Sequence, residues 1–441
     1  MLKGEKDWTL PIIIDLIKKL PKNQNPYDYL LNLIDRFFWP LPEKIFLIIL
    51  LGFGLIYFSI LICSLIVLKL SLKSNKSVSK RKQNQHWWWY RKIYISGSSN
   101  PYILINGSIT VALAEAMTSI CFLIYIFITF FTFRSTSVSR TSYAFVWYEI
   151  AWLPGTLGIW FTGWNSLLTW LSNSDIEPAK SKRSTNRSIY LNLGFIVFPL
   201  IFILQTIVFG TLIGISLHNV NDAYDDLKIQ LQLDSFDWGH QQFNQIDINN
   251  SWDLFQGLVK DLEGLLKIIH GSTASWACTG LLTFLFYIFA LYEVTNLTRK
   301  KVLKSNADNS SNYKNQLRER YYGFLIYCSM MLIVLIYDIG VGIFLYVESE
   351  NLTNATMRGI EGIIGLGGGA LVAPAMLFQV WRVMKDDEDQ LEFDQITKIE
   401  SNLNIMKVEI QKNFNKADFD NDKSVTESDK NSTIGTKNNI K

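Results

Sequence analysis

Long apolar segments alternate with polar ones along the 441 residues of the chain. A helix of about 20 mostly apolar residues is long enough to cross the hydrocarbon core of a bilayer. Seven segments reach that length, at residues 45–70, 106–133, 145–171, 189–217, 273–294, 321–347 and 359–381. The pattern predicts an all-α, polytopic membrane protein, with a bundle of seven transmembrane helices between residues 45 and 381.

The segments before and after the bundle carry shorter patterns. In residues 1–44, apolar side chains recur at helical spacing at Tyr27, Leu30, Leu31, Ile34, Phe37 and Phe38. This spacing predicts an amphipathic helix that either lies on the outer leaflet, which we favour slightly, or caps the bundle. Ile396, Ile399, Leu403, Met406 and Ile410 predict a second amphipathic helix within 382–414. The polar tail, 415–441, has a composition typical of disorder.

The charges of the loops predict the orientation of the bundle. Lysine and arginine concentrate in 71–105, 172–188 and 295–320, whereas 134–144 and 348–358 hold few and 218–272 is acidic. Cytoplasmic loops carry the excess of basic residues. We therefore expect an extracellular N-terminus and a cytosolic C-terminus, most simply in the plasma membrane. Asn249, Asn351 and Asn354 begin glycosylation acceptor patterns on the outer side.

The long acidic loop has an apolar pattern of its own. Leu254, Leu258, Leu262, Leu265, Leu266 and Ile269 share one helical face. We expect a helix that leads into the fifth span, and an ordered external lid.

Carboxylates inside the predicted spans are the candidate functional residues, because an ionisable group at bilayer depth costs roughly 2.5–3.5 kcal/mol on insertion scales. They are Glu115, Glu149, Asp338 and Glu361, and Trp152 shares a helical face with Glu149. No lysine or arginine lies at comparable depth to pair with them. We expect Glu149, Asp338 and Glu361, with Trp152, to line an outward-facing cavity for a cationic or polar ligand, and Glu115 to point into the bundle. The alternative is that each acid is protonated and hydrogen-bonded to a neighbouring helix.

The seventh predicted span is rich in small residues. Gly362, Gly365, Gly369 and Ala373 form one stripe, a spacing that lets helices approach closely. The stripe predicts tight packing within the bundle. A nucleotide-binding motif would need a preceding strand and water, so this segment does not indicate one.

Several classes of function are not indicated by the sequence. Trp87-Trp88-Trp89-Tyr90 beside Arg91-Lys92 is typical of an interfacial anchor rather than a nucleic-acid surface. The order Tyr337-Asp338 and Gly365-Leu366-Gly367 is similar to the paired motifs of presenilin-type proteases, but Gly368 stands where the second acid is required. The four histidines are scattered. We therefore expect no enzyme, no metal site, no cofactor and no nucleic-acid partner.

The span count, the orientation and the long external loop resemble the topology of G-protein-coupled receptors. The motifs of those receptors are missing: the third span ends Trp170-Leu171-Ser172-Asn173, and the seventh has Ala373-Pro374-Ala375. The leading hypothesis is a receptor-like protein that contacts a cytoplasmic partner through the basic loops and the 396–410 helix, in addition to the bilayer. The alternatives are a proton- or cation-coupled transporter or channel that uses the buried carboxylates, and a membrane scaffold without a small ligand.

Overall fold

The computed structural model describes residues 10–21, 24–38, 41–79, 90–93, 101–141, 143–173, 183–238, 245–305, 311–348, 354–371, 373–374 and 377–378. The chain divides into two units, Met1–Trp381 and Arg382–Lys441. The second unit lies outside the described residues, and with it the predicted 382–414 helix and the 415–441 tail.

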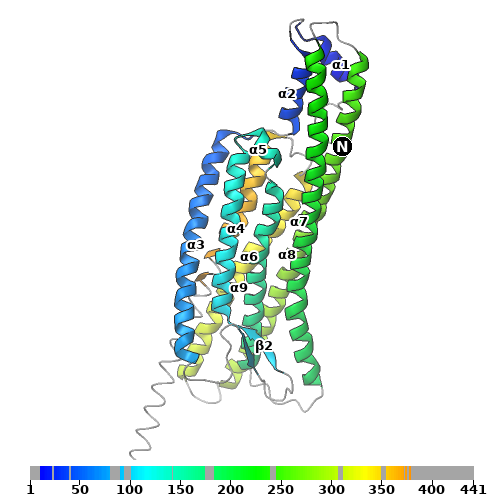
Figure 1. Ribbon diagram of the computed structural model, residues 1–441. Helices are drawn as coiled ribbons and strands as arrows, with labels where there is room; N and C mark the ends of the chain where they lie inside the picture. The colour runs from blue at the N-terminus through cyan, green and yellow to red at the C-terminus, as the bar shows by residue number, and fades with distance from the viewer. Residues whose placement is uncertain are drawn as a thin grey trace, which may run out of the picture. The chain divides into compact units, whose positions relative to one another are not determined.

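The first unit is built almost entirely of helices (Figure 1). They are α1 (Leu10–Lys18), α2 (Pro26–Phe38), α3 (Lys44–Ser79), α4 (Gly107–Thr132), α5 (Thr136–Thr141), α6 (Ala144–Asn173), α7 (Arg183–Asp237), α8 (Gln245–Ser305) and α9 (Ser311–Glu348), and a further helical segment covers 355–371. Strands β1 (Tyr90–Ile93) and β2 (Tyr102–Ile105) form an antiparallel pair. The all-α class is confirmed, with this short hairpin added.

Five helices among the described residues are long and apolar enough to cross a membrane. These stretches are Lys44–Leu72, Ile109–Thr132, Ile189–Asp237, Ser251–Asn296 and Tyr321–Val347. They indicate a membrane-embedded protein that crosses more than once. The third and seventh predicted spans correspond to α6 and to 355–371, which pack among the five without belonging to that set. The count of seven and the orientation therefore stay predictions.

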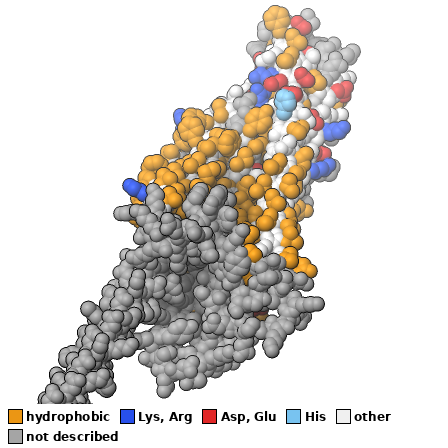
Figure 2. Space-filling model, turned by 60° about the horizontal axis from the view of Figure 1, so that its bottom comes forward, with side chains coloured by type: hydrophobic (Ala, Val, Ile, Leu, Met, Phe, Trp, Pro, Cys, Tyr) orange, Lys and Arg blue, Asp and Glu red, His pale blue; other side chains and the backbone are white. Residues whose placement is uncertain are grey.

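Apolar side chains cover the outside of these helices. Ile48 and Leu55 on α3 are each 70% exposed, and α7, α8 and α9 show similar rows of exposed aliphatic residues. Figure 2 shows the same apolar covering over the visible part of the bundle, with charged side chains gathered toward one end. An exposed apolar surface of this extent is what contact with lipid requires.

The acidic loop predicted at 218–272 is helical over most of its length, because α7 and α8 both continue through it. We call this part of α7 and α8, residues 218–237 and 245–272, the extension. On α7 its interior is a seam of Val220, Tyr224, Leu227 and Leu231, whose spacing of four, three and four suits a pair of packed helices. The predicted helix that leads into the fifth span thus forms part of a longer helical hairpin.

The N-terminal helices pack on the extension (Figure 1). Tyr27, Leu30 and Ile34 of α2 are buried in the same cluster as the α7 seam. Asn25 donates to the Ser235 hydroxyl at 2.7 Å. The apolar face of α2 is therefore covered by protein and is not open to the outer leaflet, contrary to the placement that the sequence favoured slightly.

Polar contacts tie the base of the extension to α5. Arg140 pairs with Asp225 at 2.6 Å and lies over the ring of Tyr224 at 4.5 Å. The Tyr224 hydroxyl donates to Asp35 of α2, and Asn221 donates to the Arg140 carbonyl at 3.2 Å. Helices α2, α5 and α7 are thus joined at one end of the bundle.

The hairpin of β1 and β2 lies at the other end of the bundle (Figure 1). Asn165 of α6 and Asn192 of α7 each accept a hydrogen bond from a β2 backbone N–H, at 3.1 Å in both cases. Tyr102, Leu104 and Ile105 are buried against α6 and α7. The hairpin fills the space between these two helices. Trp87, Trp88 and Trp89, the predicted interfacial anchor, lie outside the described residues.

The small residues of 355–371 lie against aromatic rings. A Cβ on Gly365 would come within 2.5 Å of the Tyr148 ring, and one on Gly369 would meet Tyr57 and Phe122. Gly362 has only an ordinary contact, 3.4 Å from Phe133, and Ala373 is fully buried. The small side chains therefore make room for rings of α3, α4 and α6.

Two tyrosines use this room to reach the backbone of the segment. The Tyr57 hydroxyl donates to the Leu366 carbonyl at 2.7 Å, and the Tyr337 hydroxyl donates to the Ile364 carbonyl at 2.8 Å. Each ring thus supplies both apolar volume and a hydrogen bond to the segment.

We expect Gly369→Ala to destabilise the protein by about 1–3 kcal/mol, the usual cost of an added methyl group in a packed interior. The new Cβ would lie 2.8 Å from Phe122 and closer still to Tyr57. Gly52→Ala on α3 is the matched control, because a Cβ added there would meet no atom within 4 Å. Thermal unfolding in detergent, followed by dye labelling of the buried thiols of Cys121 and Cys328, measures both variants. Equal melting temperatures would contradict the packing described for this segment.

Candidate functional site

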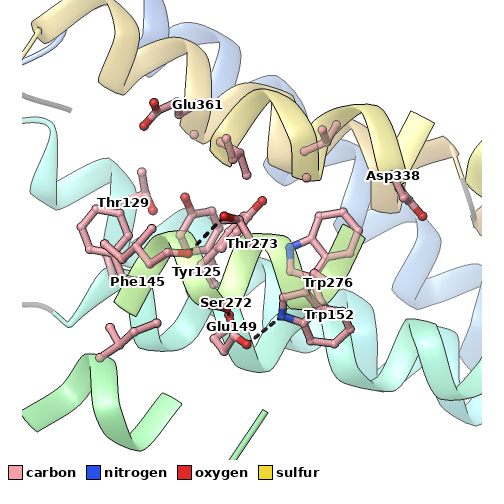
Figure 3. Close-up of a pocket in the computed structure, with 18 of the residues that line it drawn as sticks. Tyr125, Thr129, Phe145, Glu149, Trp152, Ser272, Thr273, Trp276, Asp338 and Glu361 are labelled. Carbon is pink, nitrogen blue, oxygen red and sulfur yellow. Dashed lines mark hydrogen bonds between the residues drawn. The ribbon is translucent and has the colours of Figure 1, made fainter. Parts of the chain in front are cut away.

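A cavity opens between the helices at the end of the bundle that carries α5. Its empty volume is about 1500 Å³, including the open mouth. The centre of a water molecule can occupy about 150 Å³ of this volume. Residues of α4, α6, α7, α8, α9 and 355–371 line it. Glu149, Trp152, Asp338 and Glu361 are all among them, so the structure brings these four candidate residues together. Figure 3 shows Asp338 and Glu361 across the cavity from Glu149 and Ser272.

Glu149 of α6 is buried and fully engaged by α8. Its two carboxylate oxygens accept hydrogen bonds from the Ser272 hydroxyl and the Trp276 indole N–H, each at 2.7 Å. Two such donors offset much of the cost of removing a carboxyl group from water. Glu149 therefore joins α6 to α8 at the cavity wall.

Glu361 shares its helical segment with the one cationic side chain among the cavity-lining residues. Arg358 lies three residues earlier, and its guanidinium is 6.0 Å from the Phe133 ring centroid. Arg358 and Glu361 are close enough for their charges to interact. Asn354 caps this segment, since its side-chain oxygen accepts from the backbone N–H of Thr356 at 2.9 Å.

Asp338 of α9 has different surroundings. Its Oδ1 atom is buried and accepts no hydrogen bond from the described residues. Asp338 and Trp152 both approach Gly368: a Cβ placed on Gly368 would lie 2.7 Å from both the Asp338 Oδ1 atom and the edge of the Trp152 ring. The carboxylate and the indole thus both pack closely against the backbone of Gly368, where a larger side chain would not fit.

Glu115 of α4 does not line the cavity. It is 1% exposed, and its Oε1 atom has no hydrogen-bond partner among the described residues. Its charge acts on Tyr57, as that of Asp338 does. Glu115 thus points into the bundle, behind the cavity wall rather than in it.

The cavity ends against packed aromatic rings. Its lining reaches Ile159 on α6 and Thr283 on α8, and one turn further on Tyr287 donates to the Ile159 carbonyl at 2.8 Å. Trp160 and Trp164 stack there at 5.5 Å, and Trp164 stacks on Phe286 at 5.3 Å. Together with β2, these rings form a packed cluster between α6, α7 and α8 beyond the cavity.

Sequence reasoning missed the α8 side of the cavity. Ser272, Trp276, Thr279 and Thr283 all line it. Their spacing of four, three and four places polar side chains on one face of an otherwise apolar helix. That periodicity is visible in the sequence and could have identified this wall.

The mouth of the cavity holds a strained residue. Tyr143 has a φ of 51° and is the one described residue other than glycine with a positive φ. It lines the cavity directly before α6 begins. Such conformations persist only where the surroundings enforce them, and they cluster at functional sites.

The remaining predicted sites have separate positions. Asn249 is an exposed residue on α8 in the extension, and Asn354 is exposed at the cap of 355–371. Asn351 lies outside the described residues. Among the part of the chain that is described, no group of three or more His, Cys, Asp or Glu side chains is placed to hold a metal ion.

We expect Glu149→Ala to lower the melting temperature, because Ser272 and Trp276 would each lose an acceptor inside the bundle. An unsatisfied buried donor costs about 1–3 kcal/mol. Glu149→Gln retains an acceptor oxygen and should lose less. The control is Glu263→Ala, at an exposed position of α8, and the thiol-labelling melt measures all three. If Glu149→Ala unfolds at the same temperature as the control, the two hydrogen bonds contribute nothing to stability.

Comparisons with known proteins found no relative of this chain. The chain matches no protein-family model, no curated protein and no solved structure at a significant level.

Proposed function

We propose that this protein is a seven-helix membrane receptor whose ligand enters the cavity from the extracellular side. The cavity itself carries the proposal. It lies at one end of the bundle, is lined by carboxylates and aromatic rings, and ends against a packed cluster. A site that is open at one end and closed at the other suits a protein that senses a ligand on one side of a membrane.

Seven spans require α6 and 355–371 to cross the membrane with the five apolar helices. Both pack among those helices, and both contribute to the cavity wall. The charges support the orientation. The extension, at the cavity end, is acidic, whereas Arg299, Lys300, Lys301 and Lys304 lie on the opposite end of α8.

Signalling requires that a ligand favour one arrangement of helices over another. A molecule in this cavity would contact α6, α8, α9 and 355–371 together. Pro154 lies inside α6 next to this wall and removes a backbone hydrogen bond there, which makes α6 easier to bend. We propose that such a movement reaches a cytoplasmic partner at the basic loops and at the 382–414 segment, with the protein in the plasma membrane.

A transporter is the second candidate, and one observation favours it. Glu115 and Asp338 both act electrostatically on Tyr57, so two buried acids lie near one hydroxyl group. Chains of this kind carry protons in pumps and transporters. The aromatic cluster beyond the cavity argues against an open path in this conformation. The third alternative, a membrane scaffold without a small ligand, would leave the carboxylates of the cavity without a role. We propose no catalytic activity.

The topology predicts which positions a membrane-impermeant thiol reagent reaches on intact cells. Asp226→Cys in the extension and Lys6→Cys near the N-terminus should label. Ser310→Cys, between α8 and α9, and Lys437→Cys should label only after permeabilisation. Labelling of both chain ends from the same side would exclude an odd number of spans.

A receptor should not dissipate an ion gradient. We expect purified protein in sealed vesicles to leave proton and sodium gradients as stable as in vesicles without protein. The transporter candidate instead predicts dissipation that Asp338→Asn abolishes. Flux with that sensitivity would replace the receptor proposal by the transporter.

A further inference from the structure

The cavity has more negative than positive groups among its lining residues. Glu149, Asp338 and Glu361 face one cation, Arg358. Charges in surroundings that exclude water attract one another more strongly than in bulk water. The excess of carboxyl groups therefore selects for a positively charged occupant.

The three carboxyl groups differ in how strongly they are already bound by other residues of the protein. Glu149 accepts two hydrogen bonds from α8, and Glu361 has Arg358 within reach of its charge. Asp338 also lies in the cavity wall, and its buried Oδ1 atom accepts no hydrogen bond from the described residues. A buried acceptor without a donor is unfavourable, so a ligand that brings a donor or a positive charge gains most at Asp338.

Trp152 is the second residue that we expect to contact the charged group of the ligand. Its indole edge and the Asp338 Oδ1 atom both lie against Gly368, and both residues line the cavity. Phe122 and Tyr148 hold the ring edge-on, with centroids 5.8 and 6.0 Å away. The face of an indole ring attracts ammonium groups, most strongly where water is excluded.

We propose that Asp338 and Trp152 bind the charged group of an organic cation, an amine or quaternary ammonium compound with an apolar body. This assignment rests on the proposed function in using the same cavity, but it does not require the protein to signal. The apolar body occupies the wider space lined by Tyr125, Phe145 and Tyr148.

An inorganic cation fits the same position less well. Calcium takes six to eight oxygen ligands, and magnesium needs a nearly octahedral set. No metal-holding group of acidic, histidine or cysteine side chains occurs in the described part of the chain. One carboxylate beside an indole ring instead matches the recognition of an ammonium group.

The test measures binding of labelled benzyltrimethylammonium to the full chain in lipid nanodiscs. We expect saturable binding to the wild type and a Kd at least about tenfold higher for Asp338→Asn, which keeps the shape of the side chain and removes its charge. Glu115→Gln is the matched control: it neutralises a buried acid that does not line the cavity, and the Kd should stay unchanged. Thiol-labelling melts show whether each variant is folded.

A measurement on the wild type alone keeps the test decisive if Asp338→Asn fails to fold. Neopentylbenzene has the shape of the probe with carbon in place of the charged nitrogen, and it should compete at least about tenfold less well. Absence of saturable binding, equal competition by the neutral compound, or a folded Asp338→Asn variant with wild-type affinity would each overturn the proposal. Cation binding together with ion flux would leave this site standing and remove the receptor proposal, whereas a stable gradient without cation binding would do the reverse.

Discussion

The bundle is organised by the need of polar groups to find partners within the protein, because lipid offers none. Glu149 meets this need through Ser272 and Trp276 of α8, and Tyr287 through the Ile159 carbonyl of α6. Each of these bonds joins two helices at a fixed height and rotation. Apolar contacts alone would allow neighbouring helices to slide, so the polar bonds define which faces meet.

In the glycine-rich segment 355–371, backbone carbonyl groups also find hydrogen-bond partners on neighbouring helices. It offers little side-chain volume of its own, and its neighbours supply both the volume and the hydrogen bonds. Tyr57 and Tyr337 reach its Leu366 and Ile364 carbonyls because glycines at 365, 367 and 369 let rings lie against the backbone. The stripe of small residues predicts close packing between helices. The structure shows instead that aromatic rings of neighbouring helices lie against the glycines. The spacing of the glycines does not reveal which kind of group contacts them.

The periodicity of single segments predicted more of the fold than of the site. Apolar length located the helices, and the cost of buried charge pointed to Glu149, Asp338 and Glu361. The α8 part of the extension was predicted as a helix leading into the fifth span, but the continuation of α7 was missed, since the acidic surface of 218–272 obscured the seam at Val220, Tyr224, Leu227 and Leu231. The hairpin was missed because its alternating residues, such as Tyr102 and Leu104, lay between two long helical patterns. Pairings such as Glu149 with Trp276, 127 residues apart, depend on tertiary packing, which no local pattern contains.

The extension and the cavity are physically linked, which gives the long helices a role at the site. Arg140 bonds to the extension through Asp225 and Asn221, and three residues later Tyr143 lines the cavity in a strained conformation. A strained residue of this kind persists only where the surrounding structure enforces its conformation. Helix α6 provides one support, and the anchored α5 provides the other. The mouth of the cavity is therefore shaped in part by helices that lie outside the apolar bundle.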